Sequence, residues 1–132
     1  MRNVRLRIFI TTAISLFASL AVPVGRNSAT AQNWERVPSR GVTGADVAFE
    51  RRDEQRRVHY RHRIVWDGRA LSEEGQRHAA DCSERLLYVY DAASKKWGNP
   101  LSIMDTNPRG YDATWDVSAR AAFKYTCDKY AR

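Results

Sequence analysis

The fold of this chain is decided by the stretch R-V-H-Y-R-H-R-I-V-W at residues 57–66. Apolar and charged side chains alternate along it, and such a period of two, rich in aromatic and β-branched residues, is typical of a half-buried strand. One face of this strand is expected to carry Val58, Tyr60, Ile64 and Trp66. The opposite face is expected to carry a basic stripe made of Arg57, His59, Arg61 and Arg63.

A partner strand is expected directly before this stretch. Residues 46–52 (D-V-A-F-E-R-R) also alternate, and the polar residues 53–56 between them have the length of a four-residue hairpin loop. Cross-strand pairs of aromatic side chains and of opposite charges stabilise such a register. The register predicted from this loop is Phe49–Tyr60, Val47–His62, Glu50–His59, Asp46–Arg63 and Arg52–Arg57, with His62 facing inward.

The rest of the sheet is expected C-terminal to this hairpin. Residues 85–91 (R-L-L-Y-V-Y-D) are apolar on both faces, which indicates a more central strand, with Tyr88 and Tyr90 expected in the core or on a dimer face. Two further short strands are expected near residues 95–97 and 101–104. Residues 68–80 have no clear period and predict a loop, and N-P-R-G at residues 107–110 predicts a turn.

The last segment, residues 118–130, changes to a helical period. Ser118 is an acceptable N-cap for this helix. The apolar stripe that spacings of three and four predict is Ala119, Ala122, Phe123, Thr126, Cys127 and Tyr130. The sequence therefore predicts an α+β fold, an antiparallel sheet of about five to six strands with one C-terminal α-helix.

The N-terminal segment predicts export. Three arginines precede an uncharged apolar run at residues 8–24, and A-T-A at residues 29–31 offers a cleavage site, the order found in secretory signal peptides. We expect residues 1–31 to be a signal peptide cleaved after Ala31, with an uncleaved membrane anchor as the alternative. Residues 32–132 then form a single domain without a membrane span, periplasmic or secreted, and not lipid-anchored because no cysteine lies near the cleavage site.

The net charge and the cysteine content limit the kinds of site that this domain is expected to carry. The whole chain has a net charge of +7, but residues 32–132 hold 18 basic and 15 acidic side chains, a net charge of only +3. Cys82 and Cys127 are the two cysteines, and in an oxidising compartment a disulfide between them is the default. Their spacing matches no zinc motif, so we expect no metal site and no cofactor.

Several short motifs, in this order, resemble one known family. They are W-E-R-V at residues 34–37, the strand that ends at Trp66, D-C-x-x-R at residues 81–85, Trp115, and A-A-F-K-Y-T-C at residues 121–127. This pattern is similar to that of the surface-adhesin protein E family of small exported bacterial proteins. The resemblance implies a six-stranded antiparallel sheet with a C-terminal helix joined to it by the disulfide. It also implies dimers, no enzymatic activity, and adhesion to host extracellular-matrix proteins.

Two other functions remain open from the residues themselves. The stripe Arg57, His59, Arg61 and Arg63 could follow the charges of an anionic polymer such as nucleic acid or a heparin-like glycan, or be a solvated charged face. A small secreted hydrolase or nuclease would need acid–base groups, for which the candidates are His59, Glu50, His78 and Arg61. We expect a non-enzymatic, adhesin-like binding domain, with no catalytic residues, whose partner is a protein or an anionic polymer and which can form a homodimer.

Overall fold

The computed structural model describes residues 32–103 and 113–132. The expected signal peptide and the expected turn at residues 107–110 lie outside these ranges. All described strands and the helix belong to one unit, Asn33–Arg132. Within the described residues, no helix is both long enough and apolar enough to cross a membrane.

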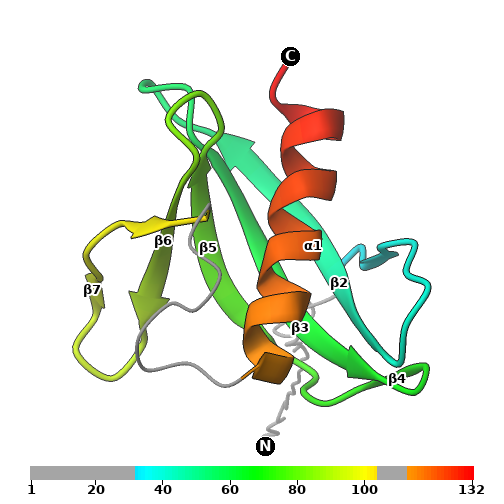
Figure 1. The fold of residues 1–132 in the computed structure, drawn as a ribbon. Helices are drawn as coiled ribbons and strands as arrows, with labels where there is room; N and C mark the ends of the chain where they lie inside the picture. Colours follow the sequence, from blue (N-terminus) through cyan, green and yellow to red (C-terminus); the bar gives the residue numbers. More distant parts are fainter. Residues whose placement is uncertain (1–31, 104–112) are drawn as a thin grey trace, which may run out of the picture. The chain divides into compact units, whose positions relative to one another are not determined.

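The described residues form an antiparallel sheet and one helix (Figure 1). The strands are β1 (Glu35–Arg36), β2 (Thr43–Arg52), β3 (Val58–Trp66), β4 (Arg69–Ala70), β5 (Gln76–Asp81), β6 (Leu86–Asp91), β7 (Lys96–Trp97) and β8 (Leu101–Ser102). Their order in the sheet is β1-β2-β3-β5-β6-β7, with β4 paired to β3 and β8 paired to β6. The α+β class and the antiparallel sheet are therefore confirmed.

The expected strand count of five to six is wrong, because the described part of the chain contains eight strands. Four of them, β1, β4, β7 and β8, are only two residues long. The short strands expected near residues 95–97 and 101–104 are β7 and β8, whereas β1 and β4 were missed because two residues leave too short a pattern to detect. The expectation of a loop at residues 68–80 is also wrong, since this range contains β4 and most of β5. The inward side chains of β5 are Gln76, His78 and Ala80, so the strand lacks the strongly apolar alternation that marks β3.

The β2–β3 hairpin has the predicted register over most of its length. Phe49 is opposite Tyr60, Val47 opposite His62, and Asp46 opposite Arg63. A β-bulge between Phe49 and Arg51 then shifts the pairing by one residue, so that Arg51 is opposite His59 and Arg52 opposite Val58. The predicted pairs Glu50–His59 and Arg52–Arg57 are wrong because the bulge inserts one extra residue into β2.

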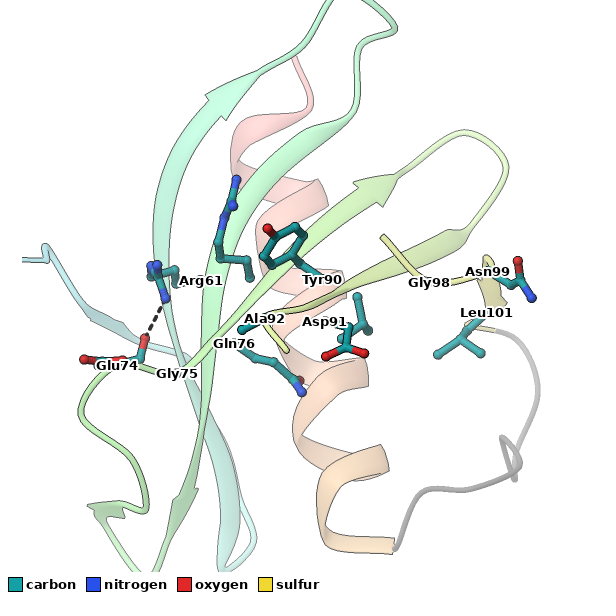
Figure 2. Close-up of a pocket in the computed structure, with 12 residues that line it drawn as sticks. Arg61, Glu74, Gly75, Gln76, Tyr90, Asp91, Ala92, Gly98, Asn99 and Leu101 are labelled. Atoms are coloured by element: carbon teal, nitrogen blue, oxygen red, sulfur yellow. Dashed lines mark hydrogen bonds between the residues drawn. The ribbon is translucent and has the colours of Figure 1, made fainter. Parts of the chain in front are cut away.

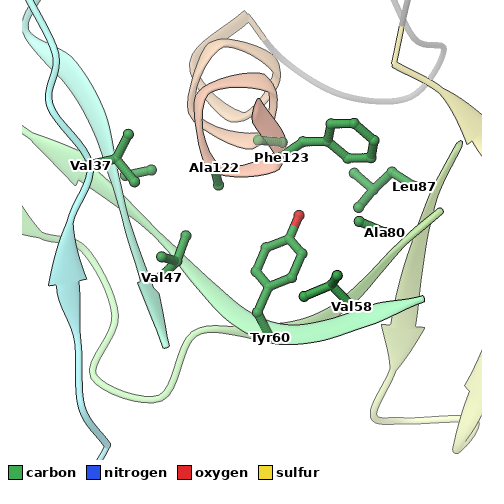
Figure 3. Close-up of a cluster of buried hydrophobic side chains, with 10 residues drawn as sticks. Val37, Val47, Val58, Tyr60, Ala80, Leu87, Ala122 and Phe123 are labelled. Atoms are coloured by element: carbon green, nitrogen blue, oxygen red, sulfur yellow. The ribbon is translucent and has the colours of Figure 1, made fainter. Parts of the chain in front are cut away.

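The hydrophobic core lies between the sheet and helix α1 (Ala113–Tyr130), which crosses one face of the sheet (Figure 1). Figure 3 shows Tyr60 pointing from β3 toward this helix, with Val47, Val58 and Leu87 around it. These side chains and Ala122 of the helix are fully or almost fully buried. The helical stripe predicted from the sequence therefore does face the sheet. In β3, Trp66 was expected on the apolar face, but it lies at the end of the strand and is 47% exposed.

Helix α1 begins five residues before the expected position. Ser118 is inside the helix and fully buried, where its hydroxyl donates to the carbonyl oxygen of Gly44 at 2.6 Å. It is therefore not the N-cap. The predicted disulfide between Cys82 and Cys127 is confirmed, and it joins the end of β5 to the C-terminal half of the helix.

Candidate functional site

The face of the sheet opposite helix α1 carries alternating arginine and aromatic side chains, and we call it the outer face. It includes the predicted basic stripe, and its members from the described strands and their flanks are Arg57, His59, Arg61, Arg63, Arg77, Tyr88, Tyr90 and Trp97. The stripe residues share this face because Val58, Tyr60 and His62 between them point into the core. The alternation of side chains along β3 therefore predicted correctly that the basic stripe lies on one face of the sheet, opposite the core.

Two members of the stripe already have a carboxylate partner. His59 is 6% exposed, and its Nε2 atom lies 2.9 Å from Asp53 Oδ2. Burial works to raise the pKa of Asp53, but hydrogen bonds from His59 and from backbone N–H groups outweigh it and hold that pKa below its usual value. Arg63 Nε donates to buried Asp46 at 2.8 Å, and its guanidinium stacks on the Trp34 ring at 4.1 Å.

The other two members have no carboxylate partner among the described residues. The guanidinium of Arg57 lies 4.5 Å from the centre of the Tyr88 ring. Arg61 Nη1 donates to the carbonyl oxygen of Glu74 at 3.2 Å, while its Nε is buried without a hydrogen-bond partner in the described part of the chain. The uncompensated charge of the stripe is therefore at Arg57 and Arg61.

A fifth arginine, which the sequence reasoning missed, extends this charge onto β5. Arg77 is the cross-strand partner of Arg61. Its guanidinium lies 4.7 Å from the centre of the Tyr90 ring, 5.6 Å from that of Trp97, and 3.9 Å from a carboxylate oxygen of Glu50. Arg77 was missed because β5 had been expected to be a loop, and the alternation of Arg77 and Ala79 with His78 and Ala80 is the weak signal that could have shown it.

The expectation that Tyr88 and Tyr90 pack in the core is wrong. Both are half-buried on the outer face, where they support Arg57 and Arg77 by cation–π contacts. Their neighbour Leu87 is the residue of β6 that enters the core. Because β6 is apolar on both faces, its sequence pattern did not show which set of side chains faces the helix.

A cleft with a volume of about 830 Å³ opens at the edge of the outer face (Figure 2). Pairing between β5 and β6 ends at His78–Val89, so the start of β5 and the end of β6 separate beyond this point. The cleft is lined by both arginines of the Arg61–Arg77 pair, by Tyr90, and by the polar residues Glu74, Gln76, Asp91 and Asn99. The side-chain oxygen of Gln76 is bonded to His78 and Trp115 on the helix-covered side of the sheet. Figure 2 shows the hydrogen bond from Arg61 to Glu74 at the rim of the cleft.

The four candidates for hydrolase chemistry are not brought together. His59 and Arg61 are on the outer face, where His59 bonds to Asp53. His78 is fully buried on the opposite, helix-covered face, with its Nε2 atom 2.9 Å from Gln76 Oε1. Glu50 is in the β-bulge and pairs with Arg77 instead of lying opposite His59.

A serine–histidine pair does occur in the core. His62 Nε2 lies 2.7 Å from Ser118 Oγ, a spacing suited to nucleophilic catalysis. Both residues are buried, and the Ser118 hydroxyl proton is already donated to the carbonyl of Gly44. Burial lowers the pKa of His62 to about 4, although the charge of Asp46 works in the opposite direction. The pair therefore serves the helix–sheet contact, and His62 faces inward as predicted.

The described residues contain no group of three or more histidine, cysteine, aspartate or glutamate side chains that could hold a metal ion. The polar chemistry of the cleft is thus that of guanidinium, amide, carboxylate and phenol groups. Comparison with protein-family models, with curated proteins and with solved structures finds no match to this chain.

Proposed function

We propose that residues 32–132 form an exported, non-enzymatic binding domain whose ligand contacts the outer face of the sheet. The observation that supports this most directly is the contrast between the two faces. Helix α1 covers one of them, while the other holds Arg57, Arg61 and Arg77 on aromatic rings or a carbonyl oxygen. Guanidinium groups fixed in this way are ready to bind carboxylate, sulfate or phosphate oxygens with little loss of side-chain entropy.

The ligand that this face favours is an anionic polymer, with adhesion to a protein as the expectation from the protein E-like resemblance. Side chains on one face of a strand recur every ~6.6–6.8 Å, so Arg57 and Arg61, four residues apart, are separated along the direction of β3 by about 13 Å. With Arg77 opposite Arg61, these charges can contact more than one anionic group of a polymer. The charge is local, because residues 32–132 have a net charge of only +3. A distributed positive field of the whole domain is therefore not what would attract the ligand.

Retention on a heparin column tests this proposal. The exported protein is compared with the triple variant Arg57→Gln, Arg61→Gln and Arg77→Gln, which removes three charges from the outer face. The matched control, Arg40→Gln, Arg69→Gln and Arg132→Gln, removes three exposed arginines that do not line the cleft. We expect the first variant to elute at clearly lower salt than the second. Equal elution of the two variants, or no retention of the wild type, would overturn the proposal.

The non-enzymatic part of the proposal has its own test. The exported protein is incubated with RNA, a peptide mixture and a glycan mixture, and product formation is followed over time. We expect no turnover above that of a heat-treated sample. Turnover that is lost in the His59→Gln variant would instead favour the hydrolase alternative, because His59 is the candidate acid–base group on the outer face.

We also propose that the domain can form homodimers, as the protein E-like resemblance implies. Light scattering of the exported protein across a range of concentrations measures the molar mass directly. A dimer that dissociates in the Tyr88→Ala variant would place the contact on the outer face, where Tyr88 lies beneath Arg57. A constant monomer mass would overturn this part of the proposal.

A further inference from the structure

We infer that the cleft between the start of β5 and the end of β6 binds an acidic sugar, whose single oxyanion bridges Arg61 and Arg77. This inference rests on the proposed function, because it names the ligand class for one part of the outer face. It is carried by three features of the described residues, namely a pair of like charges, the way each charge is held, and the mixture of polar groups in the cleft.

The first feature is the cross-strand pair itself. Arg61 of β3 and Arg77 of β5 are directly opposite each other in the register, on the same face of the sheet. Directly opposed residues have Cβ atoms about 4.5–5.5 Å apart, and like charges at such positions are destabilising. An oxyanion placed between the two guanidinium groups would convert this repulsion into two charge-assisted hydrogen-bond contacts.

The second feature is that neither guanidinium is fully used by the protein. Arg77 lies over the Tyr90 and Trp97 rings and is 3.9 Å from Glu50, a distance too long for a hydrogen bond. Arg61 makes one hydrogen bond, to the Glu74 carbonyl oxygen. In contrast, Arg63 on the same strand is both ion-paired to buried Asp46 and stacked on an aromatic ring. Donors of the Arg61–Arg77 pair thus remain for a ligand.

The third feature is the remaining lining of the cleft, which decides the kind of oxyanion-bearing ligand. Asn99, Asp91 and Tyr90 line the same space as the two arginines, so amide, carboxylate and phenol groups occur in the residues around the cleft. Asp91 is held in place because it accepts hydrogen bonds from the Ala93 N–H and the Ser94 hydroxyl.

A carboxylate such as that of Asp91 accepts hydrogen bonds from sugar hydroxyl groups, and an amide can donate to or accept from the same groups. The lining therefore favours a ligand that carries an oxyanion beside several hydroxyl groups. A volume of about 830 Å³ is within the usual range for small-molecule sites. A monosaccharide with one carboxylate or one sulfate, alone or at the end of a short glycan, has this chemistry.

Isothermal titration of the exported protein with three matched sugars tests the inference. Sialyllactose supplies a carboxylate, sulfated lactose supplies a sulfate, and lactose supplies neither. We expect at least one acidic sugar to bind and lactose not to bind, and the stronger of the two identifies the oxyanion. Binding of neither acidic sugar, or equal binding of lactose, would overturn the inference.

Single variants locate the site. Arg61→Gln and Arg77→Gln should each weaken binding of the acidic sugar by about tenfold or more, as expected for the loss of a hydrogen bond to a charged group. The matched control is Arg40→Gln, which removes an equal charge at an exposed position that does not line the cleft, and it should change the affinity by less than about twofold. Equal effects of all three variants would overturn the inference.

Folding of the variants is checked by thermal unfolding without sugar. Arg77→Gln removes the repulsion from Arg61 but also the contacts of Arg77 with Tyr90, Trp97 and Glu50, so we expect only a small change in the unfolding midpoint. A loss of binding in a variant that is folded at the titration temperature is then not due to unfolding.

The two proposals also fail separately. Heparin retention that depends on the outer face, without binding of either acidic sugar, would overturn this inference alone. If the protein neither binds an acidic sugar nor shows heparin retention that depends on the outer face, the proposed function is overturned as well.

Discussion

His62 and His78 lie beside each other in the core, with their ring centres 4.8 Å apart. Because the Ser118 hydroxyl donates to the Gly44 carbonyl oxygen, His62 Nε2 must be the donor to Ser118 Oγ. His78 Nε2 likewise donates to Gln76 Oε1, since this oxygen has no proton to give. These hydrogen bonds fix a proton on Nε2 of each ring, and burial of both rings favours the neutral form.

This pair predicts that the protein loses stability in mild acid. Burial lowers the pKa of His62 to about 4 and that of His78 well below its usual value, and the neighbouring His62 charge lowers the latter further. In the unfolded chain both histidines take up protons near pH 6.5. The unfolded state thus binds more protons below that pH, and the free energy of unfolding should fall by up to about 1.4 kcal/mol per pH unit for each histidine.

Urea unfolding of the protein at pH 7, 6, 5 and 4.5 measures this dependence. The His78→Gln variant has one buried histidine fewer, so its free energy of unfolding should fall less steeply over the same range. The matched control, His59→Gln, removes a histidine from the outer face that already has a carboxylate partner. A wild-type stability that is flat from pH 7 to 4.5 would contradict the prediction.

A second prediction concerns Asp46, whose carboxylate is buried and accepts hydrogen bonds from both Arg36 and Arg63. The Asp46→Asn variant keeps the shape but removes the charge between two arginines. We expect it to lower the free energy of unfolding by about 3 kcal/mol, the range for breaking a buried ion pair. The control is Asp128→Asn in the exposed Lys124–Asp128 pair, which should change the free energy of unfolding by less than about 0.5 kcal/mol. If urea unfolding shows the same loss of stability for both variants, the prediction is contradicted.

A third prediction compares two glycines in the left-handed region. Gly75 has φ +71°, and a Cβ atom there would lie 2.5 Å from the carbonyl oxygen of His62 and 2.9 Å from the Trp34 ring. Gly68 has φ +81° but open space around it. Gly68→Ala should therefore cost about 1–2 kcal/mol from backbone strain alone, and Gly75→Ala clearly more. Thermal unfolding of both variants measures this, and a smaller loss for Gly75→Ala would show that β3 and the loop before β5 can separate.

The disulfide gives a fourth prediction. Cys82 and Cys127 close a loop of 45 residues, for which the chain-entropy model gives roughly 4 kcal/mol of stabilisation. Adding a reductant should lower the free energy of unfolding of the wild type by about this amount. The double variant Cys82→Ala and Cys127→Ala should already be less stable and should not respond to the reductant. If reduction leaves the wild-type unfolding curve in place, the bond contributes little to the stability of the domain.

The long hairpin and the helix could be predicted from the sequence because their side chains show strong periods. The alternation in residues 57–66 gave the face of every member of the basic stripe. The bulge at Glu50 could not be predicted, because one extra residue changes no local preference and is decided by the twist of the sheet. The role of Ser118 could not be predicted either, because its hydroxyl bonds to the carbonyl oxygen of Gly44, which is far away in the sequence.

The candidate site could be predicted only in part, because some of its features leave no periodic pattern in the sequence. Arg61 was found because its strand alternates clearly. Its partner Arg77 lies in a strand whose buried positions hold a glutamine, a histidine and an alanine, so hydrophobic periodicity could not show it. The cleft depends on where β5 and β6 separate, which is a property of the paired strands and not of either segment alone.

The Cys82–Cys127 bond also affects what a protease can release from the domain. The turn between β6 and β7, residues 92–95, is exposed and lies within the loop that this bond closes. A single cut there would produce two polypeptides, one with β1 to β6 and one with helix α1, that are still covalently joined. After such a cut the helix would stay tethered to the strands that it covers, so the two parts of the core would not diffuse apart.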